Sequence, residues 1–208
     1  MRETIFKGAM LCAVFITTQT AQAQVAEVRG GLTEFDERSL NIKGLTSGQA
    51  NENSAAVNAE VIFEEPKILK WALSPQPYIN GTLNLDGNTS FGGAGLLWRQ
   101  NLGKKFYADF AFGGVIHDGT KDILFSDIAN EITADNANDI FAEIDRRFET
   151  EIEFGSRLLF REQVTLGMRV NDSWATEVFY EHLSNARLSE NGENDGVNNL
   201  GVKVARKF

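Results

Sequence analysis

Apolar and polar side chains alternate residue by residue over unusually long stretches of this chain. In residues 154–170 the even-numbered positions are mostly apolar, whereas the odd-numbered positions carry three arginines. A period of two indicates a β-strand with one apolar and one polar face. The stretch far exceeds the usual strand of about five or six residues, and a tilted strand that crosses a bilayer explains this length. The apolar positions are Phe154, Leu158, Phe160, Val164, Leu166, Met168 and Val170, with Glu162 as the exception, and the arginines are Arg157, Arg161 and Arg169.

The alternation recurs in eight segments, and we predict an all-β fold, an eight-stranded antiparallel transmembrane β-barrel. The segments are residues 26–35, 56–64, 78–85, 90–100, 105–117, 154–170, 174–184 and 197–208. A closed barrel leaves no unpaired strand edge, which a bilayer requires of β-structure. Paired charges are expected to fill the interior without a pore, and they come from Arg157, Arg161, Arg169, Glu60, Glu177 and Glu181. The alternative is a secreted soluble β-sandwich or lipocalin-like barrel, which needs polar breaks on its outer face.

The composition excludes several other classes of protein. No apolar run approaches the ~18 residues of a membrane-spanning helix, and the mean hydropathy is -0.24. A formal net charge of -9 argues against a nucleic-acid-binding protein, which needs a basic face. One cysteine excludes a disulfide framework, and two histidines, His117 and His182, are too few for a usual zinc site. We therefore expect neither a metal nor another cofactor.

The N-terminus has the pattern of an export signal. It has a positively charged start, a short apolar core and a small-x-small cleavage pattern at Ala21-Gln22-Ala23. We therefore predict a signal peptide at residues 1–23 and an outer-membrane β-barrel domain at residues 24–208. The single cysteine, Cys12, lies in the signal. The alternative is an N-terminal helix that belongs to the domain.

The lengths of the connections predict the orientation of the barrel. With both termini in the periplasm, the short turns 101–104 and 171–173 lie on the periplasmic side. The connections on the outer side are longer, as in bacterial outer-membrane barrels, and comprise residues 36–53, 86–89, 118–150 and 185–196. The chain ends in Phe208, which resembles the C-terminal signal of such barrels. The predicted location is the bacterial cell outer membrane.

The longest connection, residues 118–150, is predicted to hold a short helix. Ile140, Phe141 and Ile144 fall on one face of that helix. The helix is expected to act either as a lid or lipid-surface element, or as a packed cap over the barrel.

Two polar residues stand out at the end of the seventh segment. Glu177 and Glu181 point inward by parity, so His182 and Ser184 face the lipid near the outer end. Polar groups on a lipid-facing wall are costly, and a serine beside a histidine is the minimal nucleophile and base for acyl transfer. The alternative is a pair of interfacial polar residues that end a strand.

The sequence around this pair resembles a known family of outer-membrane barrels, the lipid A 3-O-deacylases (an acyloxyacyl hydrolase-like group). The resemblance lies in His182-Leu183-Ser184-Asn185-Ala186, followed by Asn194-Asp195-Gly196 before the last strand. Further similar stretches are Phe160-Arg161-Glu162, Tyr78-Ile79-Asn80-Gly81 and Leu83-Asn84-Leu85-Asp86-Gly87. The resemblance covers most of residues 76–117 and 154–208.

The resemblance implies a role for each site residue. Ser184 matches the family's nucleophile, His182 its base, and Asn185 the residue used around the oxyanion hole. The family's glutamate, which orients the histidine, is replaced here by Asn198, which parity places on the same outward face. An amide oxygen can accept a hydrogen bond from the imidazole but supplies no charge. Two carboxylates of the preceding loop, Glu190 and Glu193, are alternative candidates for that role, although no pattern in the sequence fixes their position.

The implied function is an outer-membrane serine esterase, a carboxylic ester hydrolase that removes the 3-O-linked acyl chain from lipid A of lipopolysaccharide. The expected partners are lipid A in the outer leaflet and the outer membrane itself, with no nucleic acid and a homodimer as a further option. The first alternative is a catalytically weak or inactive family member that acts as a structural or surface-binding barrel, which the Asn198 replacement favours. The second is a barrel that hydrolyses phospholipids with the same serine and histidine.

Overall fold

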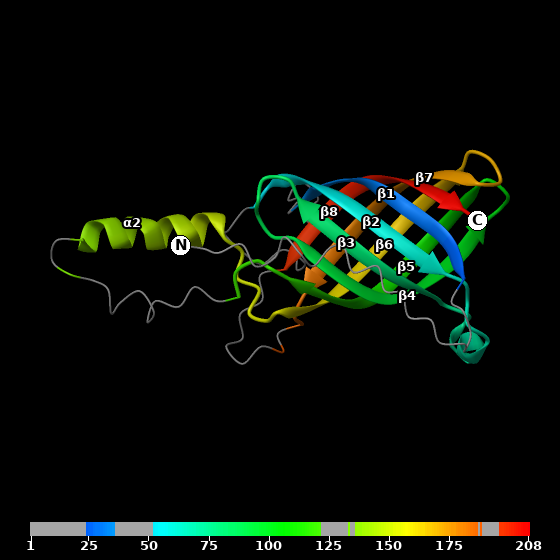
Figure 1. Ribbon diagram of the computed structural model, residues 1–208, viewed down its shortest axis with the longest axis horizontal. Helices are drawn as coiled ribbons and strands as arrows, with labels where there is room; N and C mark the ends of the chain where they lie inside the picture. The colour runs from blue at the N-terminus through cyan, green and yellow to red at the C-terminus, as the bar shows by residue number, and fades with distance from the viewer. Residues whose placement is uncertain (1–23, 36–51, 122–132, 134–135, 187, 189–195) are drawn as a thin grey trace.

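The computed structural model describes residues 24–35, 52–121, 133, 136–186, 188 and 196–208. Eight strands close into an antiparallel barrel in which each strand pairs with its sequence neighbours and the first pairs with the last (Figure 1). The strands are β1 (Val25–Phe35), β2 (Ser54–Phe63), β3 (Gln76–Asn84), β4 (Phe91–Leu102), β5 (Phe106–His117), β6 (Leu158–Arg169), β7 (Trp174–Ser184) and β8 (Val197–Lys207). The predicted all-β, eight-stranded antiparallel barrel is therefore confirmed. The predicted signal at residues 1–23 lies outside the described residues.

The outer wall of the barrel is apolar along its whole girth. In most strands the side chains alternate between buried and exposed, and most of the exposed ones are hydrophobic, with Glu34, Glu162 and Thr176 among the exceptions. The exposed hydrophobic residues include Val28, Leu32, Val57, Ile79, Leu83, Phe110, Phe112, Val164, Leu166, Val178, Val202 and Val204. A continuous apolar band around a closed barrel is what a membrane-spanning β-barrel presents to lipid. Within the described residues, none of the helices has the length and apolar character needed to cross a membrane.

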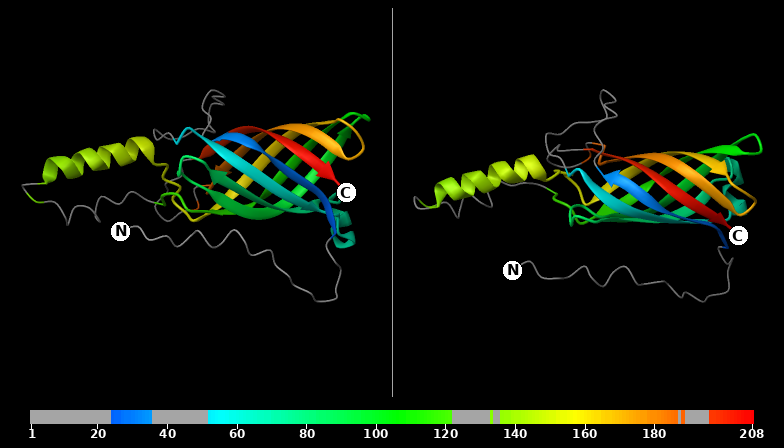
Figure 2. Two further views of the ribbon diagram at one scale, coloured as in Figure 1. Left: turned by 45° about the horizontal axis from the view of Figure 1, so that its top comes forward. Right: turned by 90° about the horizontal axis from the view of Figure 1, so that it is seen from above.

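Two helices lie at opposite ends of the barrel (Figures 1 and 2). Helix α2 (Ala137–Thr150) confirms the helix predicted in the longest connection. The helix extends beyond the outer end of the barrel and does not fold over it as a packed cap. Of the three residues predicted for its apolar face, only Ile144 is buried. The short 3₁₀-helix η2 (Lys67–Ala72) lies between β2 and β3 at the other end, where the chain also ends. That end carries the short β4–β5 and β6–β7 turns, and it is the end predicted from the sequence to face the periplasm.

The strand predicted to begin at Phe154 begins instead at Leu158. Gly155 has a positive φ of 66°, a conformation that interrupts an extended run and shifts the phase of the alternation before it. Phe154 is consequently buried inside the outer end against His117, with ring centroids 4.3 Å apart, and does not face lipid. Arg157, predicted to lie in the interior, is exposed and donates to the backbone oxygen of Gly119 at 2.5 Å.

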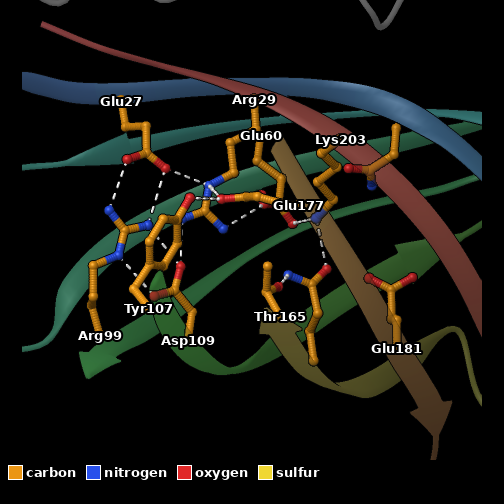
Figure 3. A network of polar contacts seen from close by, with 12 residues as sticks. Glu27, Arg29, Glu60, Arg99, Tyr107, Asp109, Thr165, Glu177, Glu181 and Lys203 are labelled. Atoms are coloured by element: carbon orange, nitrogen blue, oxygen red, sulfur yellow. Dashed lines mark hydrogen bonds and ion pairs between the residues drawn. The ribbon is translucent and has the colours of Figure 1, made fainter. Parts of the chain in front are cut away.

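The interior combines apolar clusters with buried charges. At the outer end it is closed by a buried apolar cluster of Phe35, Ala56, Phe91, Val115, Ile152, Phe154, Leu159, Leu183 and Val197. Below this cluster lies a network of buried charges, in which Figure 3 shows the predicted Glu60, Glu177 and Glu181. The predicted Arg161 belongs to the same network through its ion pairs with Glu60 and Glu181. Arg169, also predicted there, lies at the periplasmic mouth and donates to the backbone oxygen of Lys104 at 3.2 Å.

Sequence analysis missed several members of the charge network. Arg29 contacts both Glu27 and Asp109 at 2.6 Å, and Arg99 binds Asp109 through two nitrogens at 2.8 and 2.7 Å. Lys203 contacts Glu60 at 2.9 Å. Because an unpaired charge is very costly away from water, this pairing lowers the cost of burying so many charges in the interior.

Candidate active site

The outer end of β7 carries the polar residues singled out in the sequence. Tyr180, His182 and Ser184 are half-buried on the outer face, whereas Glu181 and Leu183 between them are fully buried inside the barrel. The structure therefore places His182 and Ser184 side by side on the membrane face. They are the last outward-facing residues of β7, next to the predicted outer connection.

The strand register gives His182 a polar neighbour on each side. It lies directly opposite Asn198 on β8 and directly opposite Glu162 on β6. Directly opposed residues of antiparallel strands have Cβ atoms about 4.5–5.5 Å apart. Glu162, the exception in the apolar pattern of its strand, is therefore the carboxylate next to the histidine on the same outer face.

A short chain of hydrogen bonds orients the histidine. Nδ1 of His182 lies 2.8 Å from Oδ1 of Asn198, and the hydroxyl of Tyr180 donates to the same oxygen at 2.6 Å. Because an amide oxygen only accepts, this contact fits the neutral tautomer with the proton on Nδ1 and the lone pair on Nε2. Asn198 is 2% exposed although it lies on the outer face. A buried oxygen with two donors holds the ring firmly in one tautomer, the one that leaves Nε2 as a base.

Gly196 makes room for the imidazole ring. A Cβ at this position would lie 2.8 Å from Cε1 of His182, which is closer than carbon atoms approach without a shift. The ring therefore leans over the residue that precedes β8. This position is at the same level of the barrel as Ser184, because Leu183 pairs with Val197.

An aromatic surface lies beside Ser184 on the other side. Phe160 on β6 is directly opposite Ser184 and stacks on Phe112 of β5, with ring centroids 5.9 Å apart and an interplanar angle of 15°. Both rings are partly exposed on the outer wall. An apolar chain that lies against the wall at this level therefore contacts aromatic carbon next to the serine hydroxyl.

The side chain of Asn185 points into the barrel, whereas those of His182 and Ser184 lie on the outer face. This side chain is buried, 2% exposed, and Nδ2 donates to the backbone oxygen of Phe154 at 2.7 Å. The amide is thus turned into the outer end of the barrel and ties the end of β7 to the segment before β6. The next residue, Ala186, has a positive φ of 53°, so the chain turns sharply directly after the site.

Other candidates from the sequence fall elsewhere. Glu190, Glu193 and Asn194 lie outside the described residues. His117 is inside the barrel, where Nε2 contacts the backbone oxygen of Ser156 at 2.7 Å, and it takes no part in the outer-face site. Over the described ranges, no group of three or more histidine, cysteine or carboxylate residues is arranged to hold a metal ion.

The fold and the position of the polar cluster define an outer-membrane β-barrel with a serine and an oriented histidine on its lipid-facing wall. A family model described as "Lipid A 3-O-deacylase (PagL)" matches residues 56–207. The chain belongs to the lipid A 3-O-deacylase (PagL) family and, like that family, is located in the outer membrane. A comparison with curated protein sequences finds no match.

One solved structure supports the same fold, and two others have lower similarity. The crystal structure of the outer membrane enzyme PagL is similar with a TM-score of 0.51 and 11% sequence identity, over 88% of this chain and 100% of that chain. A de novo designed transmembrane β-barrel has a TM-score of 0.47 and 9% identity, over 91% of this chain and 100% of the design. The Yersinia pestis outer membrane protein Ail has a TM-score of 0.41 and 9% identity, over 86% of this chain and 99% of Ail.

Proposed function

We propose that the protein is an outer-membrane serine esterase that removes the 3-O-linked acyl chain from lipid A of lipopolysaccharide. The observation that carries the proposal is the hydrogen bond from Nδ1 of His182 to Asn198, which leaves Nε2 as a base on the same lipid-facing strand as Ser184. Membership of the deacylase family supports the same substrate. The family's glutamate is absent, and the amide of Asn198 performs its orienting role.

The proposed reaction has two steps. Oγ of Ser184 attacks the ester carbonyl carbon while Nε2 of His182 takes its proton. The bond from that carbon to the 3-oxygen of the sugar breaks, and the sugar oxygen takes the proton from His182. A water molecule then attacks the acyl-serine, passes a proton through His182 to Oγ, and releases the fatty acid. Backbone N–H groups of the turn at Asn185 stabilise the oxyanion, and the Asn185 side chain positions this turn through Phe154.

The wall below the site suits the acyl chain. A shallow depression lined in part by Leu32, Val178, Leu200 and Val202 lies next to Tyr180, which is directly opposite Leu200. An acyl chain anchored by its ester at Ser184 and directed toward the bilayer centre runs along this apolar wall. Its burial there, instead of among lipid tails, orients the ester and lowers the entropy cost of the attack.

The second candidate function is a barrel without catalytic activity. The single observation that favours it is Asn198, because a neutral amide orients His182 but does not stabilise the charged imidazolium that forms during attack. Such a protein would retain the family's shape as a structural or surface-binding component of the outer membrane. The homodimer stays a prediction.

To distinguish an active esterase from an inactive barrel, the full chain is expressed in a bacterium whose lipid A carries six acyl chains. Mass spectrometry of the lipid A is expected to show loss of one 3-linked acyl chain relative to cells with an empty vector. Altered migration of the unheated protein in a gel checks that the barrel has folded. Unchanged lipid A from a folded barrel would favour the inactive candidate, and released phospholipid acyl chains would favour a phospholipase.

Replacing Asn198 by aspartate is expected to raise kcat by about tenfold or more. The aspartate has the same shape, so it keeps the hydrogen bonds from Tyr180 and His182 and adds the charge that stabilises the imidazolium. Asn198→Glu tests the same idea with the family's own residue. The measurement is the initial rate of fatty-acid release from lipid A in detergent. The control is Asn198→Leu, which removes the acceptor and should reduce the rate; equal rates for all variants would exclude an orienting role for this residue.

Replacing Gly196 by alanine is expected to lower kcat/KM by about 10²-fold, because the new Cβ overlaps the ring of His182 and displaces it by about an ångström from its present position. The matched control is Gly30→Ala on the outer face of β1, where a Cβ meets only the backbone oxygen of Asn58 at 3.9 Å. Both proteins should fold. Full activity of the Gly196 variant would mean that the ring does not need its present position.

A further inference from the structure

The short helix η2 exposes an apolar surface that the barrel does not cover. Ile68, Trp71 and Leu73 are 78%, 83% and 85% exposed, the highest values among the large hydrophobic residues of the described chain. Two lysines, Lys67 and Lys70, are also exposed on the same turns. A mixture of tryptophan, aliphatic side chains and lysine is typical of segments that lie in the headgroup region of a bilayer.

The helix is fastened to the lipid-facing wall and does not lie under the mouth of the barrel. The indole nitrogen of Trp98, an outward residue of β4, donates to the backbone oxygen of Ala72 at 2.9 Å. Trp98 also stacks on Phe110, its partner on β5, with ring centroids 6.1 Å apart. Figures 1 and 2 show η2 beside the periplasmic rim of the barrel. Leu73 and Ser74, both with positive φ, turn the chain back into β3.

Other residues form a belt of the same character at this end. Lys105 lies over the ring of Phe106 at 6.0 Å, and Arg206 lies over the rings of Trp174 and Phe208 at 5.6 and 5.1 Å. Phe106, Trp174 and Phe208 are all exposed on the outside of the barrel. Rings at the edge of the apolar band with cations beside them mark the level of the headgroups.

We propose that η2 is an interfacial anchor that lies in the headgroup region of the periplasmic leaflet. Ile68, Trp71 and Leu73 enter the upper acyl region, and Lys67 and Lys70 bind phospholipid phosphates. The occupant is phospholipid, because the patch is continuous with the lipid-facing wall through Trp98 and because Lys67 and Lys70 on the helix carry the charge that pairs with phosphate. Two exposed carboxylates, Glu64 and Glu65, precede the helix in the chain. This anchor is independent of the proposed esterase activity.

The test measures the depth of Trp71 in a bilayer. The full-length folded barrel is placed in vesicles of phosphatidylcholine and phosphatidylglycerol at about 3:1, which present an anionic surface. Parallel vesicles carry bromine on the acyl chains either near the headgroup or near the chain end, and bromine quenches nearby tryptophan. Since Trp71 is one of three tryptophans, Trp71→Phe is expected to remove roughly a third of the emission that shallow bromines quench.

The control is Trp174→Phe, which removes a tryptophan of the belt and should reduce shallow quenching to a similar extent. Trp71 is so exposed that its replacement leaves the barrel intact, which migration of the unheated protein in a gel verifies. If the emission lost in Trp71→Phe is quenched by aqueous acrylamide and not by either brominated lipid, the patch faces water or a periplasmic protein and the proposal is wrong.

Discussion

Replacement of Ser184 by alanine is expected to lower kcat/KM for release of the 3-linked acyl chain by at least about 10³-fold. The hydroxyl is the only nucleophile that the proposal places next to the base, so its loss leaves just binding and oxyanion stabilisation. The measurement is fatty-acid release from purified lipid A by the refolded enzyme in detergent. The His182→Ala variant is expected to fall to a similar level, and the double variant no further, because a nucleophile and its base act as one unit.

A matched control is available on the same strand. Thr176 is an exposed hydroxyl residue on the same outer face of β7, near the opposite end from Ser184. Thr176→Ala should leave the rate within about twofold of the parent enzyme. Retention of activity in Ser184→Ala would assign the nucleophile to another group, and the proposed mechanism would then fail even if the substrate is correct.

Replacement of Arg161 by leucine is expected to reduce the free energy of unfolding by roughly 3–5 kcal/mol, the usual cost of leaving a buried charge without its partner. Arg161 is fully buried, contacts Glu60 at 2.5 Å through Nη2 and binds Glu181 through Nε. Its guanidinium also lies 5.1 Å from the ring centroid of Tyr78. Lys203 still pairs with Glu60 in the variant, so Glu181 bears most of the loss.

The measurement is the urea midpoint of the barrel in detergent, followed by its migration in unheated gels. Arg157→Leu is the control, since both arginines lie on the same predicted face but Arg157 is exposed in the structure. The control should change the free energy of unfolding by no more than about 0.5 kcal/mol. Equal loss in both variants would mean that the interior charge network contributes nothing specific to stability.

Much of the barrel could be predicted because alternation is a local property. The alternation within each strand shows which of its residues face lipid. The number of strands and the outward position of His182, Ser184 and Asn198 therefore follow from this two-residue period alone. The boundaries were accurate where turns bounded the segments. The error at Phe154 and Arg157 arose at Gly155, because a left-handed residue shifts the phase of the pattern without changing its composition.

The candidate site was only partly predictable for a related reason. Parity identifies a face but not a neighbour, since the partner of a residue depends on the register between distant segments. Sequence analysis left Glu162 unexplained and assigned no role to Tyr180, yet register and hydrogen bonding bring both to the site. The inward turn of the Asn185 side chain depends on the backbone of Phe154, which no local pattern encodes.

The sequence by itself determined the fold class, the lipid-facing wall and the serine–histidine pair, because these depend on a two-residue period and a short contiguous motif. Only the tertiary structure decided which polar groups surround the histidine, how interior charges pair and that η2 is fastened to the outer wall at Trp98. These features depend on contacts between residues far apart in the chain. Closure of the barrel determines these contacts, because it fixes how each strand is aligned with its neighbours.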